Sequence, residues 1–171
     1  MNVMVDIETL GTDPGGVIVS IGAVKFDSAG LSAGFYRPVD VLSSLFAGLT
    51  VDPKTVEWWR GQNADVKGAL YPGLNVRDVL GEFAIYLQGA NTVWAKGPDF
   101  DLVLLRAVYQ KLGMKIPWSF RHSRDVRTIL ALAPSTADLV KREGAQHHAL
   151  ADARYQADQV RAVYAALRLV L

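Results

Sequence analysis

Three apolar segments lie within the first 37 residues of the chain, and the connections between them are short. Asn2 to Ile7 is rich in β-branched residues and predicts a buried strand, Val17 to Phe26 predicts a second, and Ser32 to Arg37 predicts a third. Gly11 to Gly16 has the composition of a turn. A parallel connection needs a crossover of about a dozen residues or more. The three strands are therefore expected to form an antiparallel meander.

Helical segments follow these strands. Asp52 and Pro53 begin one helix, with the aspartate as N-cap and the proline at the first helical position. Asn75 caps another that runs to about Gln88. Apolar residues recur on one face of this second helix, at Val76, Val79, Leu80, Phe83 and Leu87. That periodicity predicts an amphipathic helix packed against the core.

Short strands then alternate with helices. Thr92 to Ala95 predicts a strand. Asp99 to Leu112 predicts a helix that Asp99 can cap and that Gly113 ends. The Gly97-Pro98 pair separates this helix from the strand before it.

The last third of the chain repeats this alternation. Residues His122 to Asp125 predict a final strand, a helix begins at Val126, and the last helix runs from about Ala149 to Leu169. Strands first, then alternating helices and strands, predict an α/β fold in which helices pack on a mixed sheet.

Length and composition limit the classes of protein. The 171 residues fit a single domain over residues 1–171, and the 50% apolar content is enough for a core. A formal net charge of +1 neither indicates nor excludes a nucleic-acid partner. There are no cysteines, which excludes disulfides, thiolate zinc sites and cysteine nucleophiles. Without a signal peptide or a membrane-length apolar run, a soluble cytoplasmic protein is expected.

A carboxylate pair lies at the end of the first predicted strand. Asp6 and Glu8 are two residues apart, and in a strand that spacing points both side chains to the same face. Two like charges side by side are unfavourable unless a cation neutralises them. Mg²⁺ or Mn²⁺ would do so. The alternative is a strand that simply ends at the solvent.

Two more carboxylates occupy predicted helix starts. Asp101 falls in the first helical turn, where the helix dipole favours a negative charge. Asp152 falls near the start of the last helix, and His147 precedes it by five residues, in the loop that enters the helix. A histidine can accept a proton from a nucleophilic water. The alternatives are aspartates that serve only the helix ends, and surface histidines before an ordinary helix. Together, four carboxylates can hold two metal ions roughly 4 Å apart for phosphodiester hydrolysis.

These residues resemble the motifs of the DEDD exonucleases of the ribonuclease H-like fold, in their histidine-containing (DEDDh) form. The first motif resembles Asp6-Ile7-Glu8-Thr9, and the second resembles Phe100-Asp101 followed by Leu105. The third is a histidine, four intervening residues and an aspartate, matched by His147 and Asp152. Tyr155 and Asp158 lack the spacing of the tyrosine-containing form. The resemblance implies a ribonuclease H-like mixed sheet of five strands.

Three further stretches are similar to a compact bacterial and phage branch of this class, which includes 3′→5′ exoribonucleases and exodeoxyribonuclease VIII-like proteins. They are Thr55 to Gln62, Val93 to Asp101 and Arg124 to Thr128. One departure is the Gly-Pro pair in the second motif, where many relatives carry an asparagine before the Phe-Asp step. That difference concerns substrate positioning more than metal binding.

By this resemblance, the chain is a 3′→5′ exonuclease that binds two divalent ions, Mg²⁺ or Mn²⁺. The metal ligands would be Asp6, Glu8, Asp101 and Asp152, with His147 as general base. The substrate would be single-stranded nucleic acid with a free 3′ end, cleaved to nucleoside 5′-monophosphates. Relatives are often dimers, so a homodimer is also expected.

Substrate contacts are predicted around these residues. In the family, the positions of Thr9 and Leu10 meet the terminal nucleotide, and Phe100 belongs to the second motif. Either Trp58 or its neighbour Trp59 can stack on a base, because adjacent residues cannot share one helix face. Arg124, within a local basic run, is a candidate for phosphate binding. The alternatives are an ordinary turn residue for Leu10, core packing for either tryptophan, and ordinary surface charge for Arg124.

Two other functions fit the same residues. One is a non-catalytic nucleic-acid-binding module of the same fold, and the other is a hydrolase of short oligonucleotides. The choice between RNA and DNA stays open, because the polar groups that would read a ribose 2′-hydroxyl cannot be identified from the sequence.

Overall fold

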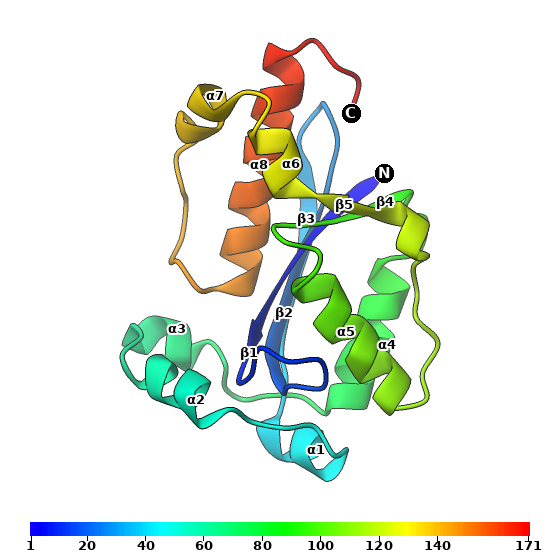
Figure 1. The fold of residues 1–171 in the computed structure, drawn as a ribbon, viewed down its shortest axis with the longest axis vertical. Coiled ribbons are helices and arrows are strands. Elements are labelled where there is room, and N and C mark those ends of the chain that lie inside the picture. Colours follow the sequence, from blue (N-terminus) through cyan, green and yellow to red (C-terminus); the bar gives the residue numbers. More distant parts are fainter.

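The computed structural model describes residues 1–171. A five-stranded sheet with the order β3-β2-β1-β4-β5 forms the centre, and helices cover it (Figure 1). The strands are β1 (Asn2–Thr9), β2 (Ile18–Phe26), β3 (Leu31–Pro38), β4 (Thr92–Ala95) and β5 (Ser123–Asp125). The first three pair antiparallel, which confirms the predicted meander. The other two pair parallel, β4 with β1 and β5 with β4. The expected mixed sheet and α/β class are therefore correct.

Eight α-helices accompany the sheet. They are α1 (Val41–Phe46), α2 (Pro53–Arg60), α3 (Ala64–Gly68), α4 (Val76–Tyr86), α5 (Asp101–Lys111), α6 (Val126–Leu130), α7 (Pro134–Asp138) and α8 (Ala149–Ala166). A 3-10 turn, Phe120–His122, precedes β5. The sequence did not predict α1, α3 and α7, which have only five or six residues each. Such short helices show no apolar periodicity. None of the helices is both long and apolar enough to cross a membrane.

Two of the predicted caps are correct and one is wrong. The Asp52 side chain accepts a hydrogen bond from Lys54 N, and Asn75 accepts from Arg77 N. Asp99 does not cap α5, which begins two residues later, at Asp101, with no side-chain cap. The backbone closes this turn instead, because the amides of Phe100 and Asp101 both donate to the carbonyl of Gly97.

The two faces of the sheet pack against different helices. Val3, Val5 and Ile7 of β1 belong to the larger core cluster, which includes buried residues of α4 and α5. Met4 belongs to a smaller cluster on the opposite face, with Ala153 and other buried residues of α8. Alternate residues of β1 thus face α8, which sets the direction of Asp6 and Glu8.

Candidate active site

The end of β1 and the start of α8 meet at a glycine. Gly22 of β2 pairs with Asp6, and a Cβ atom built on Gly22 would lie 2.1 Å from the carbonyl carbon of Ala149. Only a glycine leaves room for the helix backbone at that distance. The first turn of α8 therefore rests directly on the sheet beside Asp6, and this turn carries Asp152.

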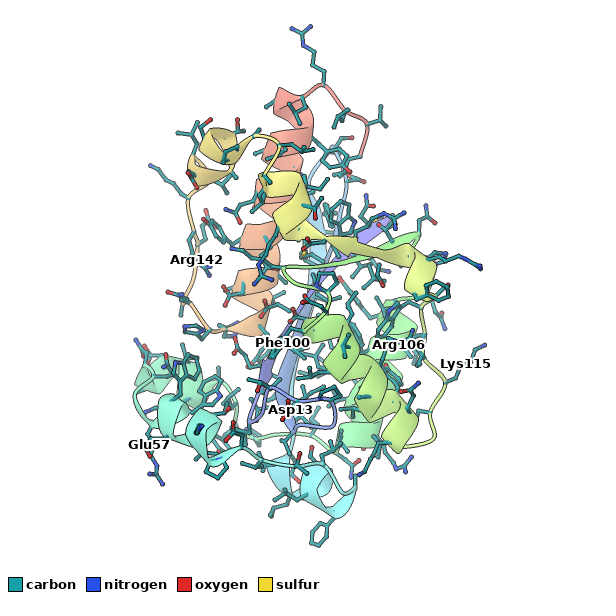
Figure 2. The ribbon with its side chains drawn as sticks, viewed as in Figure 1. Asp13, Glu57, Phe100, Arg106, Lys115 and Arg142 are labelled. Atoms are coloured by element: carbon teal, nitrogen blue, oxygen red, sulfur yellow. The ribbon has the colours of Figure 1, made fainter.

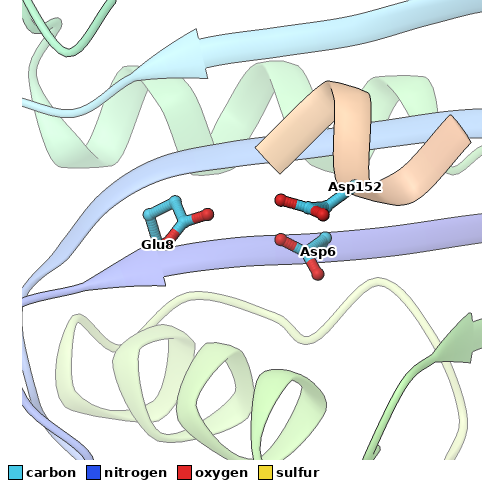
Figure 3. A group of neighbouring side chains, drawn as sticks. All are labelled: Asp6, Glu8 and Asp152. Carbon is cyan, nitrogen blue, oxygen red and sulfur yellow. The ribbon is translucent and has the colours of Figure 1, made fainter. Parts of the chain in front are cut away.

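Three carboxylates converge where these elements meet. Asp6, Glu8 and Asp152 each offer an oxygen, and these oxygens lie within 4.8 Å of one another (Figure 3). Glu8 and Asp152 are buried, and Asp6 is partly buried. The predicted convergence of the β1 pair with Asp152 is present in the structure. Such a group of oxygen donors can hold a divalent cation.

Asp101 approaches the same place from the first turn of α5. It is buried, and its Oδ1 atom accepts a hydrogen bond from the backbone amide of Ile7 at 3.1 Å. Its negative charge raises the pKa of Asp6, although burial is the larger cause of that shift. Asp101 therefore adjoins the three converging carboxylates as a fourth negative charge.

Three of these carboxyl groups, those of Asp6, Glu8 and Asp101, have raised pKa values. Burial, followed by the charges of Asp152 and Asp101, raises the pKa of Glu8 from 4.5 to about 8. Burial likewise raises the pKa of Asp101 to about 7, against the opposing effect of the hydrogen bond from Ile7. The pKa of Asp6 is raised well above its usual range by burial and then by its three carboxylate neighbours. The site therefore favours bound positive charge, either as protons or as cations.

Two polar residues that the sequence did not predict also contact this site. Gln156 is buried, and its Nε2 atom donates to Asp6 Oδ1 at 2.8 Å. It follows Asp152 by four residues on α8, so helical spacing was a usable signal for it. Arg142 lies on the segment between α7 and α8 (Figure 2). Its guanidinium pairs with Asp152. No local pattern marks Arg142.

A cleft of about 400 Å³ opens beside Glu8. Its walls come from the end of β1, the start of α2 and the turn before α5. The lining residues are Ile7, Glu8, Thr9, Thr12, Asp52, Lys54, Thr55, Trp58, Trp59 and Phe100. Figure 2 labels Phe100 at the start of α5, near the middle of the molecule. Of the predicted substrate contacts, Thr9, Trp58 and Phe100 line this cleft.

The adjacent tryptophans have different environments. Trp59 is 6% exposed, and its indole Nε1 donates to the carbonyl of Thr9 at 2.8 Å. Trp58 is 45% exposed, and its ring meets that of His147 edge-on, with 4.8 Å between centroids. Trp59 thus anchors α2 to the end of β1, while Trp58 presents a free aromatic surface beside the cleft.

The two adjacent histidines also differ. His147 has a left-handed backbone conformation, with φ of 64°, and its ring packs on Trp58. His148 accepts a hydrogen bond from Ala151 N at the start of α8 and stacks on Tyr36, with centroids 4.4 Å apart. His148 therefore has structural contacts, and His147 is the histidine that lies toward the cleft.

Two predicted substrate residues lie elsewhere. Leu10 lines a second, mostly apolar cavity of about 600 Å³ that shares Trp59 with the cleft. Arg124 is exposed on β5, where its guanidinium donates to the carbonyls of Arg121 and Ser123. The roles of both residues in substrate binding stay predictions.

Known structures share this fold over nearly the whole chain. The nuclease domain of 3′hExo, a DEDDh family member bound to rAMP, is 12% identical with a TM-score of 0.69, covering 99% of this chain and 94% of that one. Exonuclease X in complex with 5′ overhanging duplex DNA is 16% identical with a TM-score of 0.65, covering 97% and 92%. Pop2p of S. pombe, in a form with Mg²⁺ and Mn²⁺ bound, is 19% identical with a TM-score of 0.63, covering 96% and 82%.

The family match defines a 3′–5′ exonuclease, as the resemblance implied, and the fold is shared with a DEDDh family member. More particularly, residues 1–164 match the model of the 3′–5′ exoribonuclease Rv2179c-like domain, and the chain belongs to that family. A comparison with curated proteins gave no match.

Proposed function

We propose that this exonuclease binds two divalent cations through Asp6, Glu8, Asp101 and Asp152, and that it removes nucleotides from the 3′ end of single-stranded nucleic acid. The observation that carries this proposal is the convergence of three carboxylate oxygens within 4.8 Å, with Asp101 adjoining them. All four donors are carboxylates, the ligand type that Mg²⁺ and Mn²⁺ prefer. The raised pKa values of this cluster also fit a site that a cation completes.

The chemistry needs a nucleophilic water and a stabilised leaving group. Cations held by Asp6, Glu8, Asp101 and Asp152 would supply both, because they would activate the water and neutralise the leaving oxygen. His147 takes the proton of that water as general base. The bond that breaks joins the terminal phosphorus to the 3′ oxygen of the preceding nucleotide, so a nucleoside 5′-monophosphate is released. The position of His147 against Trp58, beside the cleft that contains Glu8, supports this role.

The cleft beside Glu8 is the proposed binding site of the terminal nucleotide. The exposed ring of Trp58 and the side chain of Phe100 offer aromatic surfaces for the base. A base stacked on an aromatic side chain contributes about 1–3 kcal/mol. The hydroxyls of Thr12 and Thr55 line the same cleft and can meet the hydroxyls of a terminal sugar.

RNA is the proposed polymer. The family is described by its exoribonuclease activity. A 2′-hydroxyl is both a donor and an acceptor, and the threonine hydroxyls in the cleft can serve as either.

A matched assay tests this function. We expect 5′-labelled single-stranded RNA to shorten stepwise from its 3′ end in Mg²⁺ or Mn²⁺, with nucleoside 5′-monophosphates as products. DNA of the same sequence should shorten more slowly, and EDTA should stop both reactions. Faster loss of DNA would contradict the choice of RNA, and shortening from the 5′ end would contradict the polarity. Turnover of dinucleotides alone would assign the protein to short oligonucleotides instead.

The raised pKa values predict that the metal-free protein loses stability as the pH rises. A carboxyl group with a higher pKa in the folded state binds more protons when folded, so the free energy of unfolding falls as pH rises between the unfolded and folded pKa values. For Glu8 this interval runs from 4.5 to about 8. In EDTA, we expect the melting temperature to fall by about 5 °C or more between about pH 5 and about pH 8.5.

Added Mn²⁺ should reverse this trend. Metal binding needs deprotonated carboxylates, so its stabilising effect grows as the pH rises. The measurement is the melting temperature across the pH range, with and without Mn²⁺. A flat profile in EDTA, or a Mn²⁺ effect that does not grow with pH, would contradict the proposed cation site.

A further inference from the structure

One cation of the protein contacts the carboxylate cluster. Arg142 Nη1 donates to Asp152 Oδ1, and the pair is mostly shielded, with the side chains 30% and 11% exposed. Asp152 also belongs to the group of three carboxylates that can hold a metal ion. The same carboxylate is therefore the partner of a guanidinium and a proposed metal ligand. No other salt bridge of the structure includes a residue of this cluster.

A second contact holds Arg142 in place without a hydrogen bond. Its guanidinium lies over the ring of Tyr155, 4.3 Å from the centroid, about one turn further along α8. A cation–π contact keeps a guanidinium near a ring but leaves its donors free. Arg142 can thus stay beside Tyr155, close to the carboxylates, after its bond to Asp152 is lost.

The segment that carries Arg142 is loosely held. Residues 141–146 are exposed, and no backbone amide between residues 141 and 147 donates to another backbone group. Exposure and absent backbone hydrogen bonds are typical of segments that move at low cost in free energy. The guanidinium can therefore exchange one hydrogen-bond partner for another without a change in the sheet or in α8.

Metal binding and substrate binding affect Arg142 in opposite ways. A cation among the carboxylates repels the guanidinium and competes with it for Asp152. A bound nucleic-acid strand brings phosphate to the same place. The planar guanidinium suits phosphate well, because it can donate two parallel hydrogen bonds.

We propose that Arg142 is a phosphate-binding residue for the substrate, which pairs with Asp152 while the cluster holds no cation and passes to the phosphate of the bound strand when the cluster is loaded. This inference rests on the proposed function. It assigns Arg142 two effects of opposite sign, since its charge weakens metal binding and strengthens substrate binding.

The test compares Arg142→Gln with Lys141→Gln. Lys141 is the adjacent residue, makes no ion pair and lines a separate cavity, so it is a matched control for the charge of the segment. Titration calorimetry without nucleic acid measures the affinity for Mn²⁺. We expect Arg142→Gln to bind Mn²⁺ about 3-fold more tightly, because a partly shielded ion pair no longer competes. Lys141→Gln should leave this affinity unchanged.

Kinetics on single-stranded RNA measure the second effect. We expect Arg142→Gln to raise KM about tenfold, as loss of a charged hydrogen bond does. The slope of log KM against log salt concentration should fall by about 0.7, as expected when one phosphate contact of a single strand is lost. Arg142→Lys should recover part of the salt slope.

Unchanged or weaker Mn²⁺ binding by Arg142→Gln would overturn the proposal. So would an unchanged KM and salt slope, which would leave Arg142 as a structural ion pair alone. A different result would contradict the proposed function itself: the unaltered protein would neither bind Mn²⁺ nor shorten RNA.

Discussion

Replacing Asp6 with asparagine is expected to lower the rate of RNA hydrolysis by more than about 100-fold. Substituting a residue that only hydrogen-bonds to a metal ligand typically costs about 10- to 100-fold, and losing the ligand itself should cost more. Asp6 adjoins the other carboxylates, and all three contribute to its raised pKa. An amide oxygen can still accept the hydrogen bond that Gln156 Nε2 donates to Asp6 Oδ1. The side chain therefore keeps its shape and loses only its charge. The measurement is the rate of mononucleotide release in Mg²⁺ and in Mn²⁺.

The melting temperature distinguishes a loss of catalysis from a loss of folded structure. The substitution removes one negative charge from a cluster in which the charges repel one another. We therefore expect the melting temperature of Asp6→Asn in EDTA, above about pH 8, to equal or exceed that of the unaltered protein. Asp78→Asn, at an exposed position on α4, is the matched control and should change neither property. Full activity of Asp6→Asn would rule out Asp6 as a metal ligand.

Replacing His147 with asparagine is expected to lower kcat by about 10²- to 10⁴-fold, the usual contribution of a general base. Asparagine is a suitable replacement because His147 has a φ of 64°, and asparagine tolerates the left-handed conformation better than alanine. An amide cannot take up the proton of the water. The affinity for Mn²⁺ should be unchanged, because the proposed metal ligands are the four carboxylates.

The pattern of losses distinguishes a base from a structural residue. His122→Asn, at an exposed position in the 3-10 turn before β5, is the control and should keep full activity. A strongly basic reaction pH supplies hydroxide directly, so the deficit of His147→Asn should shrink there. An equal deficit at every pH, together with a lower melting temperature, would point to a structural role instead.

Short-range patterns in the sequence accounted for the elements that frame the site. The brief connections between the first three strands required antiparallel pairing, and β1, β2 and β3 pair that way. The two-residue spacing of Asp6 and Glu8 placed both on one face of β1, where they meet Asp152. Sequence order and spacing also led to a 3′→5′ exonuclease, which the family match bears out.

Other features depended on contacts between distant residues. The start of α5 differs from the prediction because Gly97 accepts the backbone amides of the turn, while Asp101 accepts from Ile7 on β1. Whether Trp58 or Trp59 is exposed followed from the hydrogen bond between the Trp59 indole and the carbonyl of Thr9. The distant partners in these contacts, Ile7 and Thr9, both lie on β1, far along the chain from the residues that they hold.

The sequence by itself determined the order of the elements and the residues that carry the carboxylates, because strand alternation, helix caps and connection lengths are local properties. Only the tertiary structure decided how closely these carboxylates approach and what else contacts them. Gly22 lets the start of α8 rest on the sheet beside Asp6, and the bend of the chain before α8 brings Arg142 to Asp152. Both contacts join residues of different elements, and the spacing of residues along the sequence does not mark which residues of different elements will meet.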